Sequence, residues 1–330
     1  MTIRALKLPG DFAPLVDLLV RTFQYPENPE WSIKSDEQEE LAGHLKAFQK
    51  LWPLFRIAQL LVPSFRDGMR GHAWEEDGVL AAATIYHRLG ATSAWDISTV
   101  GVLPDYRRRG FARQLLEETL RDIRARGGKQ ISLGVIAQNI PARSLYRSLG
   151  FEDFGGFIKY ACTIDTPIDV PPIPSGYTIK RLKRSDWRTR YELERRITPS
   201  ATTKYDPVTV GKARAPLLIR PLVSVLLAVR GIREASYAIR STSLDRIVAI
   251  GGYSVPARGK GMCRIFIRLD PVHGKLAEFL IRRLQRDCFE LNPGSRIEIS
   301  IRHWMPDVIH AAAACDMERR VDNRRMGLLL

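Results

Sequence analysis

The chain has 330 residues, 45% of them hydrophobic and 26% charged, which is the balance of an ordinary folded protein and favours two domains over one. The most apolar run, residues 215–231, contains Arg220 and Pro221 and is too short to span a bilayer, and the N-terminus lacks the pattern of a secretory signal. We therefore expect a cytoplasmic protein with no membrane contact.

The first half of the chain predicts a mixture of strands and helices. A short strand at 2–6 precedes a helix that begins near Asp11, a residue that caps helices well. A second helical region begins at the acidic run 35–40 and continues to Pro63, and residues 71–90 predict a hairpin that turns at 75–78. The remaining predicted elements are a strand at 92–104, a helix at 110–125, a strand at 131–139, a short helix at 141–150 and closing strands at 151–164.

The middle of the chain predicts a linker. Residues 163–177 contain four prolines, which exclude a regular helix and weaken any strand. We therefore place a linker at 166–176, between a first domain at 1–165 and a second at 177–330. The second domain repeats the element order of the first, with strands at 236–241, 246–255 and 262–271, a helix at 274–291, a strand at 296–304, a helix at 306–316 and a closing strand. The predicted fold class is α/β with a duplicated unit.

The charge is unevenly divided between the two halves. The net charge is +15, yet residues 1–165 hold 21 Lys and Arg against 20 Asp and Glu, which leaves 30 against 16 for the rest of the chain. Such a basic half attracts nucleic acid, acidic substrates or an acidic partner. The four cysteines have no spacing typical of a metal site or a disulfide framework, so we expect buried thiols and no metal.

One junction between a predicted strand and a predicted helix is suited to phosphate. The segment "RRRGFA", residues 107–112, places Gly110 and Ala112 where N–H groups at a helix start attract anions. Cations at a helix N-terminus cost a few tenths of a kcal/mol each, so three arginines there favour a bound anion over a merely solvated helix end. The segment is neither a Walker loop nor a Rossmann fingerprint.

Two motifs together resemble the GNAT acetyltransferases. The first is Arg107-x-x-Gly110-x-Ala112, and the second is the N-x-x-A-x-x-L-Y-x-x-x-G-F pattern from Asn139 to Phe151. The resemblance implies acetyl-CoA as co-substrate and a mixed, mostly antiparallel sheet flanked by helices. It further implies that Val100, Gly101 and Val102 pair with the pantetheine arm, which Asn139 also binds. The pyrophosphate would be held at Arg107, Arg108, Arg109, Gly110, Phe111, Ala112 and Arg113.

The same resemblance implies that Tyr146 protonates the departing thiolate, although an aromatic residue on a helix face also packs well in a core. Acetylation of an amine also needs a proton acceptor. Asp96 is our candidate, because strand alternation from Val102 through Val100 and Ser98 places it on their face. Glu75, Glu76 and His87 on the adjacent hairpin are alternatives.

The second half lacks both motifs, since "DPVHGK" and "MPDVIHAAAACD" stand at the corresponding places. We expect a degenerate second unit in a tandem arrangement similar to the mycothiol synthase-like proteins, where the active unit is instead the C-terminal one. The predicted function is N-acetylation of an unidentified primary amine by direct attack, in the first domain. The alternatives are a non-catalytic acyl-CoA-binding or regulatory protein, and nucleic-acid binding by the basic half, which shows no recognisable nucleic-acid module. A homo-oligomer is compatible with the sequence.

Overall fold

The computed structural model describes residues 2–25, 66–210, 231–257 and 261–330, with residues 29, 32, 43, 49, 51–53, 55–57 and 59–60. The predicted helical region at 35–63 and the apolar run at 215–231 lie largely outside these residues. Among the described residues, no helix is long and apolar enough to cross a membrane. The chain divides into two compact units. The first comprises Met1–Phe154, Lys204–Asp206 and Arg324–Leu330, and the second comprises Gly155–Thr203 and Pro207–Asn323.

The sheet of the first unit combines strands from both ends of the chain. Its strands, in spatial order, are β1 (Thr2–Ala5), β2 (Arg70–Glu76), β3 (Val79–Arg88), β4 (Ala94–Val102), β5 (Gln130–Ile136) and the end of β12 (Glu318–Leu329). Strands β1 to β4 are antiparallel to their neighbours, whereas β4 and β5 are parallel. The backbone N–H of Leu330 donates to the carbonyl oxygen of Lys129 at 3.0 Å. The last residues of the chain therefore complete the sheet of the first unit.

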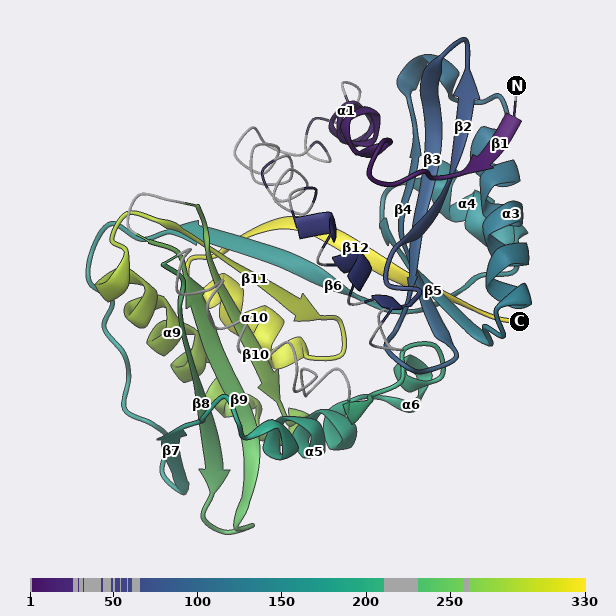
Figure 1. Cartoon of the computed structure of the whole chain (residues 1–330). Coiled ribbons are helices and arrows are strands. Elements are labelled where there is room, and N and C mark those ends of the chain that lie inside the picture. Colours follow the sequence, from purple (N-terminus) through teal and green to yellow (C-terminus); the bar gives the residue numbers. More distant parts are fainter. Residues whose placement is uncertain are drawn as a thin grey trace. The chain divides into compact units, whose positions relative to one another are not determined.

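Helices cover both faces of this sheet (Figure 1). On one face lies α1 (Phe12–Thr22), whose Leu15, Leu18 and Leu19 repeat at helical spacing and pack against alanines of β2 and β3. On the other face lie α3 (Phe111–Ala125) and α4 (Ile140–Ser148), which enclose a core around Trp95. The sheet is thereby held between two apolar layers.

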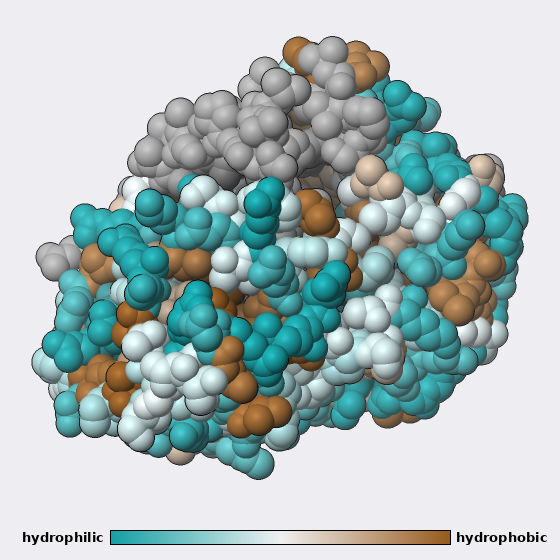
Figure 2. Space-filling model, turned by 90° about the horizontal axis from the view of Figure 1, so that it is seen from below, coloured by the Kyte–Doolittle hydropathy of each residue, from teal (hydrophilic) through white to brown (hydrophobic). Residues whose placement is uncertain are grey.

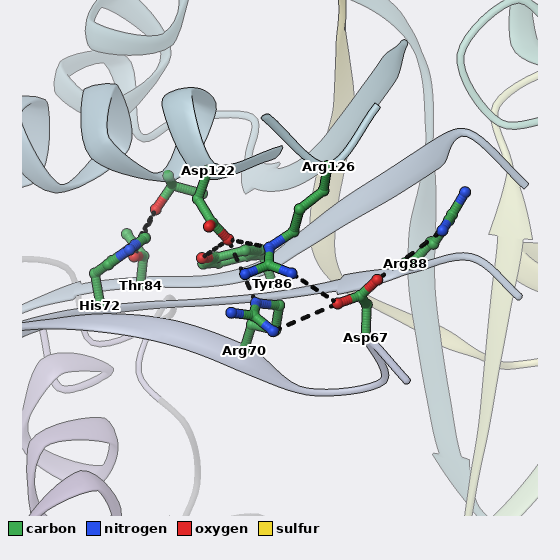
Figure 3. Close-up of polar contacts among 9 residues, drawn as sticks. Asp67, Arg70, His72, Thr84, Tyr86, Arg88, Asp122 and Arg126 are labelled. Carbon is green, nitrogen blue, oxygen red and sulfur yellow. Dashed lines mark hydrogen bonds and ion pairs between the residues drawn. The ribbon is translucent and has the colours of Figure 1, made fainter. Parts of the chain in front are cut away.

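A polar network ties α3 to the sheet of the first unit (Figure 3). The carboxylate of Asp122 accepts hydrogen bonds from the Tyr86 hydroxyl at 2.7 Å and from Nε of Arg126 at 2.8 Å. Beside it, Nδ1 of His72 lies 3.2 Å from the hydroxyl of Thr119. Burial lowers the pKa of His72, an effect that Asp122 partly opposes.

The buried imidazole makes the stability of the first unit depend on pH. His72 takes up its proton at higher pH in the unfolded chain than in the folded one, so the free energy of unfolding should decrease as the pH falls through the region below about 6.5. We expect the fall in Tm between about pH 7.5 and 5.5 to be smaller in His72→Gln than in the wild type. The exposed His310 supplies the control, because His310→Gln should leave the fall unchanged. Equal falls in the wild type and His72→Gln would contradict the prediction.

The second unit has the same kind of sheet. Its strands, in spatial order, are β6 (Glu152–Thr163), β11 (Arg296–Arg302), β10 (Cys263–Leu269), β9 (Arg246–Val255), β8 (Arg233–Ser241) and β7 (Tyr177–Arg181). Again one pair, β10 and β11, is parallel. The helices α9 (Ala277–Leu291) and α10 (Pro306–Ala314) pack on one face, and α5 (Trp187–Ile197), followed by α6 (Ser200–Thr203), packs on the other. The predicted tandem α/β fold is confirmed.

Strand β6 differs from the sequence expectation. The predicted closing strands at 151–164 form one long strand, Glu152–Thr163, and from Gly155 onward it belongs to the second unit, where it pairs with β11. Gly155 and Gly156 have φ of +154° and +153°, a conformation that essentially only glycine adopts. A Cβ at Gly156 would lie 2.1 Å from the carbonyl oxygen of Asn323, so the backbones approach closely there.

On the face shown in Figure 2, the hydrophobic residues at the surface form small groups that are separated by hydrophilic residues. Single exposed apolar side chains of this kind are normal for a folded protein.

Candidate active site

The strand that leads into the predicted phosphate cradle contains an irregularity. In the antiparallel pairing of β3 with β4, Ile85 faces Thr99 but Tyr86 faces Ile97, so Ser98 is an extra residue. Such a bulge bends a strand and changes the direction of the side chains that follow it. The Ser98 hydroxyl donates to the carbonyl oxygen of Ile85 at 3.2 Å, so a hydrogen bond connects the bulge of β4 to the neighbouring strand β3.

The bulge corrects the predicted alternation along β4. Val100 packs against the core beneath α3, as do Trp95 and Ile97 before the bulge. Asp96 lies between those two residues and is hydrogen-bonded to Ser132. The expectation that Asp96 shares a face with Val100 and Val102 is therefore wrong, because the extra residue reverses the alternation.

A tight turn connects β4 to α3. Residues Pro104–Tyr106 form one turn of 3-10 helix, and then Arg108 and Gly110 adopt left-handed φ values of +64° and +84°. Gly110 is the N-cap residue of α3, and no side chain caps the first turn of this helix. Backbone N–H groups arranged in this way form a concavity that binds anions.

The three arginines of this turn have different environments. Nη2 of Arg107 donates to the carbonyl oxygen of Thr22 at 3.1 Å, which attaches the turn to the end of α1. Nη2 of Arg109 donates to the carbonyl oxygen of Asp105 at 3.0 Å. Arg108 is exposed, and within the described part of the chain it has no hydrogen bond or ion pair. The guanidinium of Arg108 is therefore available to a ligand.

The two motifs meet in one groove of about 850 Å³. Of the residues that the sequence singled out, it is lined by Val100, Val102, Arg107, Arg108, Gly110, Phe111, Ala112, Arg113, Asn139 and Tyr146. Gly101 and Arg109 do not line it. A Cβ at Gly101 would lie 2.9 Å from Cδ2 of Leu18 in α1, so this residue faces the opposite side of the sheet. Sequence reasoning missed Thr22 and Tyr25, which also line the groove and follow from no motif.

Asn139 and Tyr146 come from the second motif. Oδ1 of Asn139 accepts from the backbone N–H of Ala142 at 3.2 Å, so this residue caps α4. Tyr146 is 6% exposed and packs edge-on against Phe151. Burial raises the pKa of Tyr146, so its hydroxyl keeps its proton throughout the neutral range.

Asp96 lies in a different polar cluster from the groove. Its Oδ2 accepts from the Ser132 hydroxyl at 2.9 Å and is ion-paired with Arg325, which comes from β12. His87 faces Asp96 across the strand pair, and burial lowers the pKa of His87. The alternatives on the hairpin are also paired, since Glu75 lies 2.8 Å from Nε of Arg4 and Glu76 lies 3.9 Å from Nη1 of Arg109. Nothing in the local sequence indicated Arg325.

The corresponding junction of the second unit is built differently. Strand β10 pairs with β9 without a register shift, so it has no bulge against β9. After it, the side chain of Asp270 caps a 3-10 turn over Pro271–Leu276, and Nδ1 of His273 lies 2.8 Å from the Tyr177 hydroxyl. A Cβ at Gly274 would lie 2.2 Å from Oδ2 of Asp307. Side chains thus fill the place that the open cradle has in the first unit. In the described residues, no group of three His, Cys, Asp or Glu could hold a metal ion.

The part of the chain that forms the groove is similar in sequence to known acetyltransferases. Residues 14–151 match the family described as acetyltransferase (GNAT) family. A mycothiol acetyltransferase of Saccharomonospora viridis is 30% identical over 142 residues, which are 38% of this chain and 45% of the relative. An N-alpha-acetyltransferase RimI of Mycobacterium tuberculosis is 42% identical over 80 residues, 24% of this chain and 49% of the relative. The chain thus spans less than half the length of these curated relatives.

Solved structures extend the likeness in fold to both units. A tandem GNAT protein from the clavulanic acid biosynthesis pathway superposes over 99% of this chain and 98% of its own with a TM-score of 0.62 and 12% identity. A GCN5-related N-acetyltransferase from Sphaerobacter thermophilus gives 0.65 over 99% and 95%, with 15% identity. Residues 14–151 are thus similar in sequence to the acetyltransferase (GNAT) family, and the chain as a whole has the fold of a tandem GNAT protein.

Proposed function

We propose that the first unit transfers the acetyl group of acetyl-CoA to a primary amine. The observation that carries this proposal is the single groove that joins the left-handed turn at Gly110, the bulged end of β4 and Tyr146. The GNAT family uses acetyl-CoA, and the printed names of the relatives describe acetyl transfer. A binding site limited to a phosphate would not need a buried phenol at its far end.

Several residues of the groove have a part in the proposed reaction. The N–H groups at the start of α3 and the guanidinium of Arg108 hold the pyrophosphate. The strand edge at Val100 and Val102, beyond the bulge, binds the pantetheine arm. The side-chain NH₂ group of Asn139, whose Oδ1 caps α4, donates a hydrogen bond to the same arm. Tyr146 donates its hydroxyl proton toward the sulfur as the amine attacks the thioester carbon. The attack is direct, since all four cysteines belong to the second unit and none lies on this groove.

Removal of the amine proton is the remaining step. Asp96 was the candidate base, but Arg325 and Ser132 already occupy its Oδ2, and it does not line the groove. We therefore propose that Asp96 keeps the ends of β4 and β12 in place, and that the amine enters as its neutral form or loses its proton to water. Holding a neutral amine against the thioester already supplies a large part of the rate acceleration.

The location of the site is tested by paired substitutions in the two units. Valine at Gly110 must adopt a left-handed φ of +84° and places a branched side chain in the cradle, so Gly110→Val should raise the KM for acetyl-CoA about tenfold or more. At the corresponding junction of the second unit, Val272 is 85% exposed, and Val272→Asp should leave this KM unchanged. Release of free thiol from acetyl-CoA with a panel of amines and amino-terminal peptides measures both.

Two results would contradict the proposal. If Val272→Asp impairs acetyl-CoA binding and Gly110→Val does not, the site lies in the second unit. If acetyl-CoA raises the Tm but no amine in the panel releases thiol, the chain is a non-catalytic acyl-CoA-binding protein.

A further inference from the structure

The second unit contains a cavity of about 730 Å³ beside α9. It is lined by the end of β6, by the proline-rich segment that follows this strand, by α9 and by the two residues after α10. The proline-rich segment is attached to the same unit, because the backbone N–H of Gly294 donates to the carbonyl oxygen of Ile164 at 3.1 Å and Ile168 packs against the core. The cavity therefore lies within one unit.

The side chains around this cavity are mainly acidic. Against the single cation Arg282, the described lining residues supply four carboxylates, those of Asp165, Asp169, Glu278 and Asp316. Nε of Arg282 donates to Oε1 of Glu278 at 3.0 Å, and its Nη2 donates to the carbonyl oxygen of Ala314 at 3.2 Å. The three aspartate carboxylates have no ion pair or hydrogen bond within the described part of the chain. An excess of three negative charges remains, although the second half of the chain is basic. We call this cavity the acidic cavity.

A buried amide lines the acidic cavity with one atom unpaired. Gln285 of α9 is 1% exposed, and its Nε2 donates to the carbonyl oxygen of Cys315 at 3.0 Å and lies 3.4 Å from Sγ of Cys162. Because a carbonyl oxygen can only accept, the amide nitrogen must face it, which leaves Oε1 without a hydrogen-bond partner among the described residues. A buried acceptor without a donor is costly, so a ligand that brings a donor is favoured here.

The first unit has leucines at the corresponding positions. The buried positions of α3 recur with the same spacing from Leu276 onward, α4 and α10 have nine residues each, and β12 and β6 have twelve each. The matching pairs are Leu120 with Gln285, Leu149 with Cys315, and Leu328 with Cys162. The three leucines belong to the apolar core around Trp95. A place that is apolar in the first unit is thus polar in the second, which packing alone does not require.

We propose that the acidic cavity of the second unit binds a protonated aliphatic amine. Its ammonium N–H groups donate to the aspartate carboxylates and to Oε1 of Gln285, since these atoms only accept. Its methylene groups contact Ile164, Ile168 and the prolines that also line the cavity. In the described residues no three side chains of the metal-ligating kinds converge, so an organic cation suits this cavity better than a bare metal ion. The proposal is independent of the acetyl transfer assigned to the first unit.

The test is a calorimetric titration of the full chain with 1,4-diaminobutane at low ionic strength, with coenzyme A present so that no acetyl group is transferred. We expect binding that Asp165→Asn and Asp316→Asn each weaken about fivefold. Both aspartates are exposed, and asparagine tolerates the left-handed φ of +58° at position 316, so both variants should fold. Gln285→Leu introduces the leucine of the first unit and should weaken binding about tenfold.

Asp245 provides the matched control. It is exposed in the same unit, has a left-handed φ of +46° and does not line the acidic cavity, so Asp245→Asn should change the affinity less than twofold. Amine bound in the groove of the first unit is not affected by any of these substitutions, so a selective loss of affinity supports the acidic cavity as the site. Butane-1,4-diol, which has the same carbon chain without the charges, should not bind.

Three results would overturn the proposal. The first is that 1,4-diaminobutane does not bind, or binds no better than the diol. The second is that folded Asp165→Asn and Asp316→Asn bind the diamine as tightly as the wild type. The third is that Mg²⁺ displaces the diamine at equal concentration, which would make the acidic cavity a metal site.

Discussion

Replacement of Tyr146 by phenylalanine should lower kcat about a hundredfold while the KM for acetyl-CoA changes less than about threefold. The substitution removes only the hydroxyl, whereas the ring continues to pack against Phe151. General acid catalysis usually contributes a factor of about 10² to 10⁴. We expect the low end of this range, because burial raises the pKa of Tyr146 and makes full proton transfer to a thiolate less favourable.

A second buried tyrosine provides the control for this substitution. Tyr160 is 5% exposed in the core of the second unit, so Tyr160→Phe deletes a hydroxyl of the same kind away from the groove. Its kcat should stay within a factor of about two of the wild type. The raised pKa of Tyr146 also predicts that ionisation of this residue does not reduce kcat up to about pH 10. If Tyr146→Phe keeps its full kcat, the tyrosine only packs in the core.

The expectations from the sequence agree with the structure most closely where they concern backbone conformation. Gly110 was expected where the backbone must stay open, and the structure gives it a left-handed φ of +84°, which glycine adopts readily. Asn139 was expected only from the resemblance, and the structure adds that it caps α4. The same reasoning could not separate Arg107, Arg108 and Arg109. Their roles depend on what each guanidinium reaches, and Arg107 reaches Thr22, which is far away in the sequence.

The errors of the sequence analysis have two physical causes. Strand alternation assumes a regular pleat, and the extra residue Ser98 reverses the face of Asp96 without any signal in composition. Contacts between residues that are far apart in the sequence also leave no local sequence pattern. Arg325 reaches Asp96 across 229 positions, and no local pattern could indicate that pair. The sequence therefore indicated no charged partner for the carboxylate of Asp96, whereas in the structure this carboxylate is ion-paired with Arg325.

The strand at the C-terminus has a consequence for stability that the order of elements does not suggest. Met326 is fully buried, and it packs in the core of the first unit with Trp95, Ile97 and Phe151. Truncating a buried methionine to alanine typically costs about 2–5 kcal/mol. Met326→Ala should therefore destabilise the first unit by about that amount, although the residue lies at the opposite end of the chain.

Binding of acetyl-CoA identifies the transition to be measured, because a ligand stabilises the unit that binds it. In denaturant titrations, Met326→Ala should lower the midpoint of the transition that acetyl-CoA raises, and thiol release should be lost at lower denaturant concentration. Met305 is 3% exposed in the core of the second unit, and Met305→Ala removes a side chain of the same size there. It should affect the ligand-sensitive midpoint less than Met326→Ala does. The reverse order would mean that the end of β12 stabilises the second unit and that the acetyl-CoA groove does not depend on the C-terminal strand.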